Sequence, residues 1–188
     1  MGKLEARHSI PAGSIRLAAI VTETPRALLS LGEFAPGIDS RVSFLTWGME
    51  DLAAALGASG QREDDGSLTP TFQLARTLCL VAASAAGALA IDGVYTDFRD
   101  AKGLADEARR ARRDGFSGKL AIHPDQIPVI HAAFSPSAAE VERAERIVAA
   151  FAAASGAGVT SLDGKMIDRP HLTHAQRVLA LAGGKTPP

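Results

Sequence analysis

The residues of this chain best suited to chemistry are carboxylates that directly follow apolar runs. Glu23 follows the run 14–22, and the pair Glu50 and Asp51 follows the run 41–47. If such runs are parallel strands, loops and helix N-termini converge at their carboxyl ends, where ligands bind. Carboxylates with no cysteine and no histidine cluster beside them are hard oxygen ligands suited to Mg²⁺. One interpretation is therefore a magnesium site that contains Glu23 and Asp51.

A simpler interpretation gives these two carboxylates no ligand. Asp51 precedes the helix-like segment 52–57 and would cap it, while Glu23 would face solvent. Asp97, Asp100 and His123 also follow apolar runs, and His123 either lines a pocket or is a buried structural histidine. The arginines at 109, 110, 112 and 113 have the spacing of a solvated helix face. Spacing alone leaves both interpretations open.

The elements that must position these residues alternate between strand-like and helix-like segments. The nearly continuous apolar runs 14–22, 41–47, 89–96 and 118–123 are typical of strands buried on both faces of a parallel sheet. Helix-like stretches follow them at 24–34, 71–87, 100–115 and 124–134, with Asp100 as the expected N-cap of the third and Gly115 as its stop. This alternation predicts an α/β fold with a parallel sheet.

The last part of the chain departs from this alternation. A helix is predicted over 135–154, with Ser137 and Glu140 forming a capping box. A loop or small hairpin around Asp163 and Gly164 follows, and then a final helix over 171–184. We therefore expect two parts, residues 1–135 and a C-terminal helical extension or lid over 136–188.

Composition limits the classes of protein to consider. The 188 residues are 46% hydrophobic and 22% charged, with a net charge of −1, so bulk electrostatics favours neither a nucleic-acid nor a membrane partner. The apolar runs are shorter than the roughly 18 residues that span a bilayer, and the N-terminus does not look like a signal peptide. The single cysteine, Cys79, rules out a disulfide framework. We expect a cytoplasmic protein.

Four sequence motifs carry a resemblance to a known family. They are "IVTETPRAL", "FLTWGMEDLAAALGA", the segment beginning "AIDGVYTDFRDAKGLADEARR", and "LDGKMIDRPHLTHAQRVLA". In this order, along almost the whole chain, they resemble the HpcH/HpaI aldolase and citrate lyase beta-subunit family. The resemblance is greatest to its CoA-ester lyases of the malyl-CoA, β-methylmalyl-CoA and citramalyl-CoA type. It implies a (β/α)8 TIM-barrel enzyme that binds Mg²⁺ and cleaves or forms a carbon–carbon bond beside a CoA thioester.

The resemblance also implies roles for individual residues. Glu23 and Asp51 match the two metal-binding carboxylates of the family. Trp47, Gly48 and Glu50 belong to the same motif as Asp51 and are expected to bind substrate at the mouth of the barrel.

Asp168 matches a catalytic acid of the family's lyases that covers the active site of a neighbouring subunit. This correspondence implies a homo-oligomer, a trimer or a hexamer.

The resemblance begins at the fifth strand of the barrel. We therefore expect strands five to eight plus the helical tail, a truncated form of a Mg²⁺-dependent lyase whose small-molecule partners are an acyl-CoA and a 2-oxo acid. Half a barrel would leave Leu17, Ala19 and Val42 uncovered. Two different functions stay open, an inactive fragment that acts as an assembly or binding module and a CoA-independent 2-oxo-acid aldolase of the same superfamily.

Overall fold

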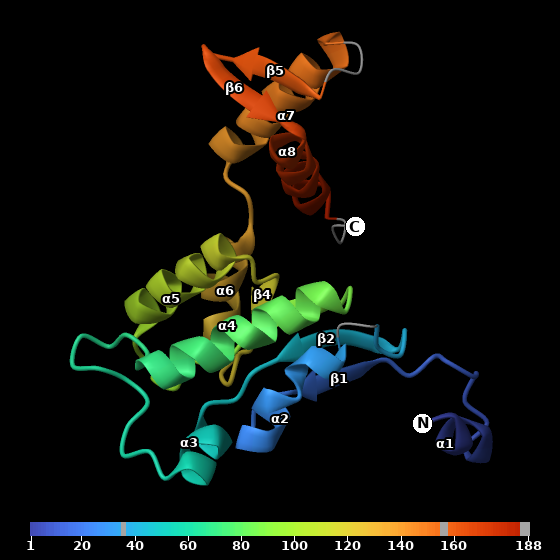
Figure 1. Ribbon diagram of the computed structural model, residues 1–188, viewed down its shortest axis with the longest axis vertical. Coiled ribbons are helices and arrows are strands. Elements are labelled where there is room, and N and C mark those ends of the chain that lie inside the picture. The colour runs from blue at the N-terminus through green and yellow to red at the C-terminus, as the bar shows by residue number, and fades with distance from the viewer. Residues whose placement is uncertain (35–36, 155–157, 185–188) are drawn as a thin grey trace. The chain divides into compact units, whose positions relative to one another are not determined.

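The structure of the chain is a computed structural model that describes residues 1–34, 37–154 and 158–184. It contains two compact units, unit 1 (Met1–Phe134) and unit 2 (Ser135–Pro188), drawn in Figure 1. The sequence placed a boundary after residue 135. Residues 155–157, the start of the predicted loop, lie outside the described part of the chain.

Unit 1 contains a four-stranded parallel sheet. Its strands are β1 (Leu17–Ile20), β2 (Val42–Thr46), β3 (Leu89–Asp92) and β4 (Gly118–Lys119), and they lie in the order in which they occur in the chain. The predicted α/β class with a parallel sheet is confirmed. Each strand is shorter than its apolar run, because the residues at the carboxyl end leave the ladder to begin the turn toward the next helix.

The helices of unit 1 follow the strands as predicted, with two differences. They are α1 (Gly2–Arg7), α2 (Pro25–Leu29), the 3-10 helix η1 (Leu31–Phe34), α3 (Glu50–Leu56), α4 (Pro70–Ala85), α5 (Ala101–Asp114) and α6 (Gln126–Phe134). The sequence did not predict α1. The helix predicted over 24–34 is interrupted at Ser30, where the backbone leaves the α-helical conformation.

Local capping explains where two of these helices begin. The Thr24 side chain accepts a hydrogen bond from the backbone N–H of Ala27 at 3.1 Å, and Pro25 opens α2. Asp100 caps α5 as predicted, accepting from the N–H of Gly103 at 2.9 Å. Gly115 ends α5 at φ 115°, a left-handed conformation that favours glycine.

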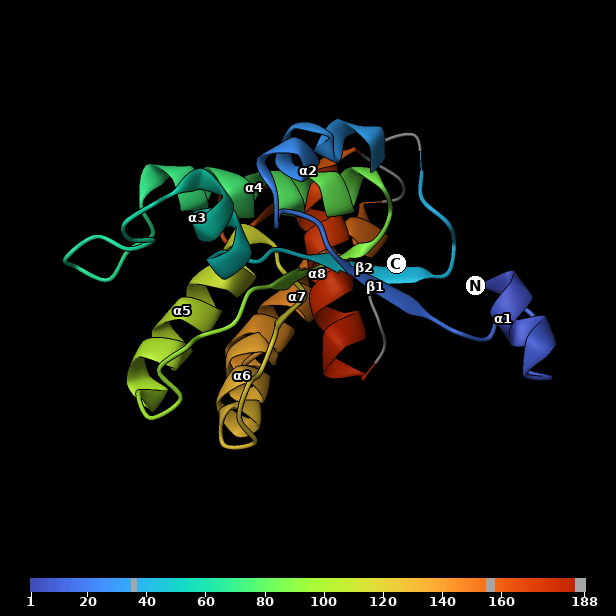
Figure 2. The same cartoon turned by 90° about the horizontal axis from the view of Figure 1, so that it is seen from below.

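The core of unit 1 lies between the sheet and α4. Figures 1 and 2 show α4 running across the sheet, with α2 on the same side of β1 and β2. Leu45 from β2 and Phe72 from α4 are almost fully buried, and each such side chain contributes about 1.5–3 kcal/mol of transfer free energy. Cys79 of α4 is also buried, and burial raises the pKa of its thiol to about 12. It is therefore a packing residue.

The two faces of the sheet differ in their cover. Ala19 and Val42 pack against the α4 core and Leu17 is half-buried, so the prediction that they would be left uncovered is wrong. Alternation turns Leu17 and Ala19 to one face, and a bulge in the pairing of β1 with β2 places Val42 opposite Leu17. The residues on the opposite face include Ala18, which is exposed, and Ile20, which is 49% exposed. The exposed apolar surface of this sheet is therefore formed by Ala18 and Ile20, on the face opposite α4.

Unit 2 is a helical hairpin with a small antiparallel sheet. It contains α7 (Ala138–Ala153), β5 (Val159–Leu162), β6 (Lys165–Asp168) and α8 (Arg169–Ala182). The capping box of Ser137 and Glu140 and the hairpin at Asp163 and Gly164 are confirmed. Its core contains Ile147 from α7, Ile167 from β6 and Val178 from α8.

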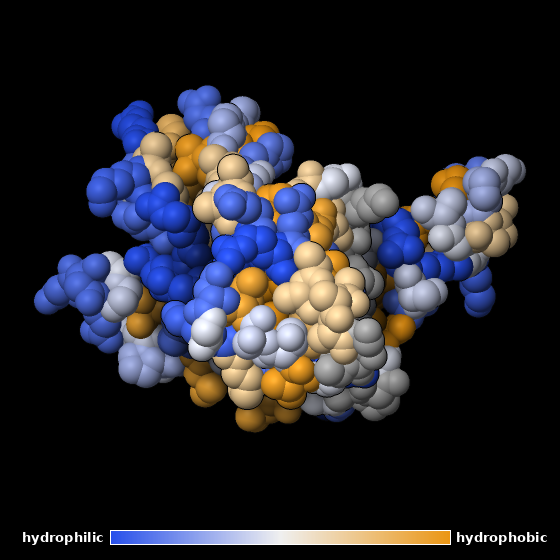
Figure 3. All heavy atoms as spheres, turned by 90° about the horizontal axis from the view of Figure 1, so that it is seen from above, coloured by the Kyte–Doolittle hydropathy of each residue, from blue (hydrophilic) through white to orange (hydrophobic). Residues whose placement is uncertain are grey.

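Hydrophobic side chains also reach the surface of the chain. In unit 2, Val159 is 53% and Met166 is 66% exposed. On the face seen in Figure 3, hydrophobic residues are interspersed with hydrophilic ones. Within the described residues, the structure has no helix that is both long enough and apolar enough to cross a membrane.

Candidate active site

One buried side chain joins the carboxyl ends of β1 and β2. The hydroxyl of Thr22 donates a hydrogen bond to the carbonyl of Gly48 at 3.2 Å and accepts one from the N–H of Gly48 at 3.0 Å. Thr22 is fully buried. Because Glu23 follows Thr22 and the α3 turn follows Gly48, this junction brings the two predicted metal-binding segments together.

The Glu23 side chain extends along this junction. A Cβ atom added to Gly48 would lie 3.8 Å from Cγ of Glu23 and 3.2 Å from Cγ2 of Ile20. Glycine at position 48 therefore leaves room for the Ile20 side chain, while the Glu23 side chain lies at ordinary van der Waals distance.

The three carboxylates near the junction differ in their partners. Glu50 accepts a hydrogen bond from Nε2 of Gln61 at 2.8 Å. In the part of the chain that the structure describes, the carboxylates of Glu23 and Asp51 have neither a hydrogen bond nor an ion pair. Asp51 lies in the first turn of α3, where its charge also favours the helix dipole, but it accepts no capping hydrogen bond.

This set of donors is compatible with Mg²⁺. The described residues contain no group of three or more histidine, cysteine or acidic side chains arranged to hold a metal ion. Magnesium keeps several water ligands and is commonly bound by one or two carboxylates together with its substrate. Glu23 and Asp51, whose carboxylates have no partner among the described residues, meet that requirement without a third protein ligand.

Trp47 lies in the core of unit 1 rather than at an open surface. Its side chain is buried, and Nε1 donates a hydrogen bond to Oδ1 of Asp92 at 2.7 Å. A Cβ on Gly93 would lie 3.1 Å from Nε1 of Trp47, so glycine is needed beside the indole. The direct contact with substrate predicted for Trp47 disagrees with this position. The cause is alternation, which turns Trp47 to the same face as the buried Leu45.

A buried charge cluster around Asp92 could not be found from the sequence. Asp92 accepts from Nε of Arg76 at 2.9 Å and from Nζ of Lys119 at 3.3 Å, and all three side chains are buried. Lys119 also pairs with Glu107 at 2.8 Å. Burial alone raises the pKa of Asp92, but the charges of Lys119 and Arg76 outweigh it and hold this pKa below its usual value. The one indication of this cluster in the sequence is that an acid, Asp92, and a lysine, Lys119, lie within apolar strand segments.

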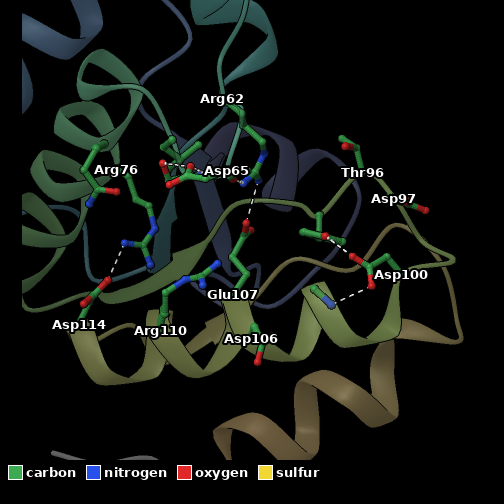
Figure 4. Close-up of a pocket in the computed structure, with 16 residues that line it drawn as sticks. Arg62, Asp65, Arg76, Thr96, Asp97, Asp100, Asp106, Glu107, Arg110 and Asp114 are labelled. Atoms are coloured by element: carbon green, nitrogen blue, oxygen red, sulfur yellow. Dashed lines mark hydrogen bonds and ion pairs between the residues drawn. The ribbon is translucent and has the colours of Figure 1, made fainter.

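The structure also contains an open cleft of about 670 Å³ in unit 1. Figure 4 shows Arg62 reaching Glu107 and Arg76 reaching Asp114 along its wall, at 2.8 and 2.7 Å. Burial and the nearby Asp100 carboxylate raise the pKa of Tyr95 to about 12.

Most groups that line this cleft are already paired with one another. The lining residues are Arg62, Asp65, Gly66, Ser67, Leu68, Gln73, Arg76, Tyr95, Thr96, Asp97, Asp100, Gly103, Asp106, Glu107, Arg110 and Asp114. Neither Glu23 nor Asp51 is among them. The cleft is therefore separate from the predicted metal site, and it holds the strand-end acids Asp97 and Asp100.

His123 and the α5 arginines have separate positions. The ring of His123 stacks on Phe98 with centroids 4.8 Å apart and is partly exposed. Arg109 pairs with Asp106 of its own helix, whereas Arg110 lines the cleft.

Asp168 begins α8 and is paired with a histidine one turn further on. Oδ1 of Asp168 lies 2.5 Å from Nδ1 of His171, and the two side chains are 36% and 47% exposed. The hydrogen bond from the His171 ring lowers the pKa of Asp168. Asp168 is therefore a carboxylate at neutral pH, able to accept a proton.

Comparison with known proteins identifies the family. Residues 4–124 match the family described as HpcH/HpaI aldolase/citrate lyase. The chain belongs to this family.

Curated relatives in this family have related names. A citrate lyase subunit beta-like protein of Mycobacterium tuberculosis is 39% identical over 178 residues, 90% of this chain and 64% of that protein. A (3S)-malyl-CoA thioesterase of Cereibacter sphaeroides is 41% identical, covering 85% of this chain and 54% of that protein. The mitochondrial citramalyl-CoA lyase of Homo sapiens is 37% identical, covering 90% and 47%. The chain thus spans about half to two thirds of the length of these relatives.

A solved structure of the Mycobacterium tuberculosis protein CitE is similar in fold. It has a TM-score of 0.75 and 41% identity, and the match covers 85% of this chain and 58% of that one. That protein was crystallised with magnesium, acetoacetate and coenzyme A. The parallel α/β fold seen here is thus similar to part of the fold of that solved structure.

Proposed function

We propose that this chain is part of a Mg²⁺-dependent carbon–carbon lyase that acts on a 3-hydroxyacyl-CoA of the malyl-CoA, β-methylmalyl-CoA or citramalyl-CoA type. The observation that carries the proposal is the Thr22–Gly48 junction, which brings two segments with unpartnered carboxylates, Glu23 and Asp51, to neighbouring strand ends. The names of the relatives and the magnesium, acetoacetate and coenzyme A in a similar structure support it.

The proposal assigns a role to each residue near the junction. Glu23 and Asp51 hold Mg²⁺, which when bound acts as a Lewis acid toward the carbonyl oxygen of a 2-oxo acid. Gly48 and Glu50 of the same turn bind the substrate, and Glu50 is held by a hydrogen bond from Gln61. Trp47 acts indirectly, because its bond to Asp92 fixes the residue before Gly48.

Asp168 is the proposed proton carrier. As a carboxylate it accepts a proton from the acyl-CoA α-carbon when the carbon–carbon bond forms. In the cleavage direction Asp168 first takes up a proton from solvent and delivers it to the same carbon, while the proton of the substrate hydroxyl leaves to solvent as the carbonyl of the 2-oxo acid forms. We propose that Asp168 does so in the site of a neighbouring copy of a homo-oligomer.

The four strands of unit 1 are proposed to be strands five to eight of a (β/α)8 barrel, with unit 2 as the lid. This assignment agrees with the partial coverage of the longer relatives.

A second candidate activity is hydrolysis of the thioester. It is favoured by the 41% identity to a (3S)-malyl-CoA thioesterase. An inactive binding module and a CoA-independent 2-oxo-acid aldolase are distinguished from both activities by the same assay.

Product analysis separates these functions. The purified chain is incubated with malyl-CoA or citramalyl-CoA and Mg²⁺, and free thiol and 2-oxo acid are measured in parallel. A lyase releases a 2-oxo acid without free thiol, whereas a thioesterase releases thiol without 2-oxo acid. Absence of both products would support the binding module, and turnover of a 2-oxo-acid aldol without CoA would support the aldolase.

Matched variants connect the activity to the site. Glu23→Gln and Asp51→Asn should abolish both Mg²⁺ binding, measured by calorimetry, and 2-oxo acid release. Glu63→Gln, an exposed acid in the loop after α3, is the control and should behave as wild type. Full activity in both site variants would contradict the proposal.

A further inference from the structure

We infer that Thr22 is a positioning residue for the magnesium site, because its hydroxyl fixes the distance between the segment of Glu23 and the turn of Asp51. The inference rests on the proposed function. It concerns a buried residue that touches neither the metal nor the substrate.

The hydroxyl of Thr22 connects the two segments just beyond the last backbone hydrogen bond between β1 and β2. The N–H of Val21 donates to the carbonyl of Thr46 at 2.9 Å, and in the described chain no backbone bond joins the two segments beyond it. From there on, the segments are held by the two hydrogen bonds between the Thr22 hydroxyl and Gly48.

Both hydrogen bonds are needed because they oppose different movements. The Thr22 hydroxyl binds both the N–H and the carbonyl of Gly48, so it fixes the orientation of this residue as well as its position. A hydroxyl can do so because it is at once a donor and an acceptor. Gly48 has no side chain that could hold the turn in another way.

A neighbouring threonine provides the comparison. Thr46 is also buried at the end of β2, but its hydroxyl has no partner among the described residues. The same substitution at positions 22 and 46 removes a hydroxyl from similar surroundings, and only the change at 22 breaks hydrogen bonds to Gly48.

The test is calorimetric titration of the full chain with Mg²⁺. Thr22→Val should weaken binding by about 10- to 100-fold, the range found when partners of metal ligands are removed. Thr22→Ser retains the hydroxyl and should bind within about threefold of wild type on the same scale. Thr46→Val should bind as wild type, and circular dichroism checks that each variant is folded.

The possible outcomes separate this inference from the proposed function. Wild-type affinity in Thr22→Val, with binding lost in Glu23→Gln, would overturn the role of Thr22 alone. A wild-type chain that binds no Mg²⁺ would overturn the metal site and this inference with it. If Thr22→Val does not fold, Thr22→Ser provides the test. This variant retains the hydroxyl, so loss of Mg²⁺ binding would contradict the inference that the hydroxyl is the essential group.

Discussion

The indole nitrogen of Trp47 lies 2.7 Å from Oδ1 of Asp92, and both side chains are buried. This hydrogen bond joins the end of β2 to the end of β3 on the side of the sheet that faces α4. Trp47 is the neutral donor of a carboxylate whose other partners, Arg76 and Lys119, are cations. The end of β2 is therefore held by Asp92 at Trp47 and by Thr22 at the next residue, Gly48.

Replacing Trp47 by Phe should destabilise unit 1. The aromatic ring would remain, but Asp92 would lose a buried donor, which costs about 1–3 kcal/mol. Urea unfolding followed by circular dichroism measures the change in the free energy of unfolding. Thr46→Val serves as the control, because the Thr46 hydroxyl makes no hydrogen bond in the described chain. Equal stability of Trp47→Phe and wild type would show that the bond contributes nothing.

Asp92→Asn should destabilise the protein in a pH-dependent manner. At neutral pH the variant removes the most buried counter-charge of Arg76 and Lys119, which keep only Asp114 and Glu107 as partners, at a cost of at most about 3–5 kcal/mol. The folded-state pKa of Asp92 lies below its ordinary value of 3.8. Its contribution is therefore complete above that value and is lost as pH falls through the lower folded pKa.

The difference in melting temperature between wild type and Asp92→Asn should thus be largest near neutral pH and decrease as the pH falls below 3.8. Thermal unfolding at a series of pH values tests this. A difference that stays constant across the range would contradict the linkage.

Gly103→Ala should destabilise the start of α5. A Cβ at this position would lie 2.1 Å from both Oδ2 of Asp100 and the hydroxyl of Tyr95, so the cap and its partner must move. Overpacking of this kind costs about 1–3 kcal/mol. Gly32→Ala is the matched control, since nothing lies within 4 Å of its added Cβ. Thermal melting of the two variants should give a lower melting temperature for Gly103→Ala only.

The apolar sheet face opposite α4 should cause the chain to self-associate. Ile20 is 49% exposed on that face, and its neighbour Ala18 is exposed as well. Ile20→Lys should shift the chain toward smaller species in sedimentation velocity. Leu29→Lys is the control, because Leu29 is 89% exposed on α2. A wild-type chain that sediments only as monomer would exclude this role of the face.

Asp168 should act in the site of a neighbouring copy. Mixing Asp51→Ala with Asp168→Asn, each inactive alone, should restore part of the lyase activity, because hybrid oligomers contain sites with both residues intact. Product release is measured after subunit exchange has been verified with labelled chains. Absence of recovery despite exchange would place Asp168 in its own subunit or outside the chemistry.

The sequence predicted those parts of the fold that depend on local chemistry. The caps at Asp100 and Ser137 and the stop at Gly115 need only neighbouring residues, so spacing was sufficient. The direction of Trp47 and of Ala19 depended on which face of the sheet the helices cover, and that is decided by packing. The partners of Asp92 come from positions 47, 76 and 119, and no local pattern connects them.

In the candidate site, too, some residues could be predicted from the sequence and others only from the structure. Glu23 and Asp51 could be proposed from their strand-end positions, whereas Thr22 could not, because a threonine in an apolar run fits a strand without any further role. Its hydrogen bonds are visible only when Gly48 is placed beside it.

The charge cluster around Asp92 has a consequence for how the chain reaches its fold. Asp92 meets Arg76 of α4 and Lys119 of β4 only when β3 has its present alignment with its neighbours. Sliding β3 by one residue would turn Asp92 to the opposite face and leave Arg76 and Lys119 with only their more exposed partners, Asp114 and Glu107. A misaligned sheet is thus penalised electrostatically. The ion pairs of Asp92 therefore favour the native register of β3 over a shifted one.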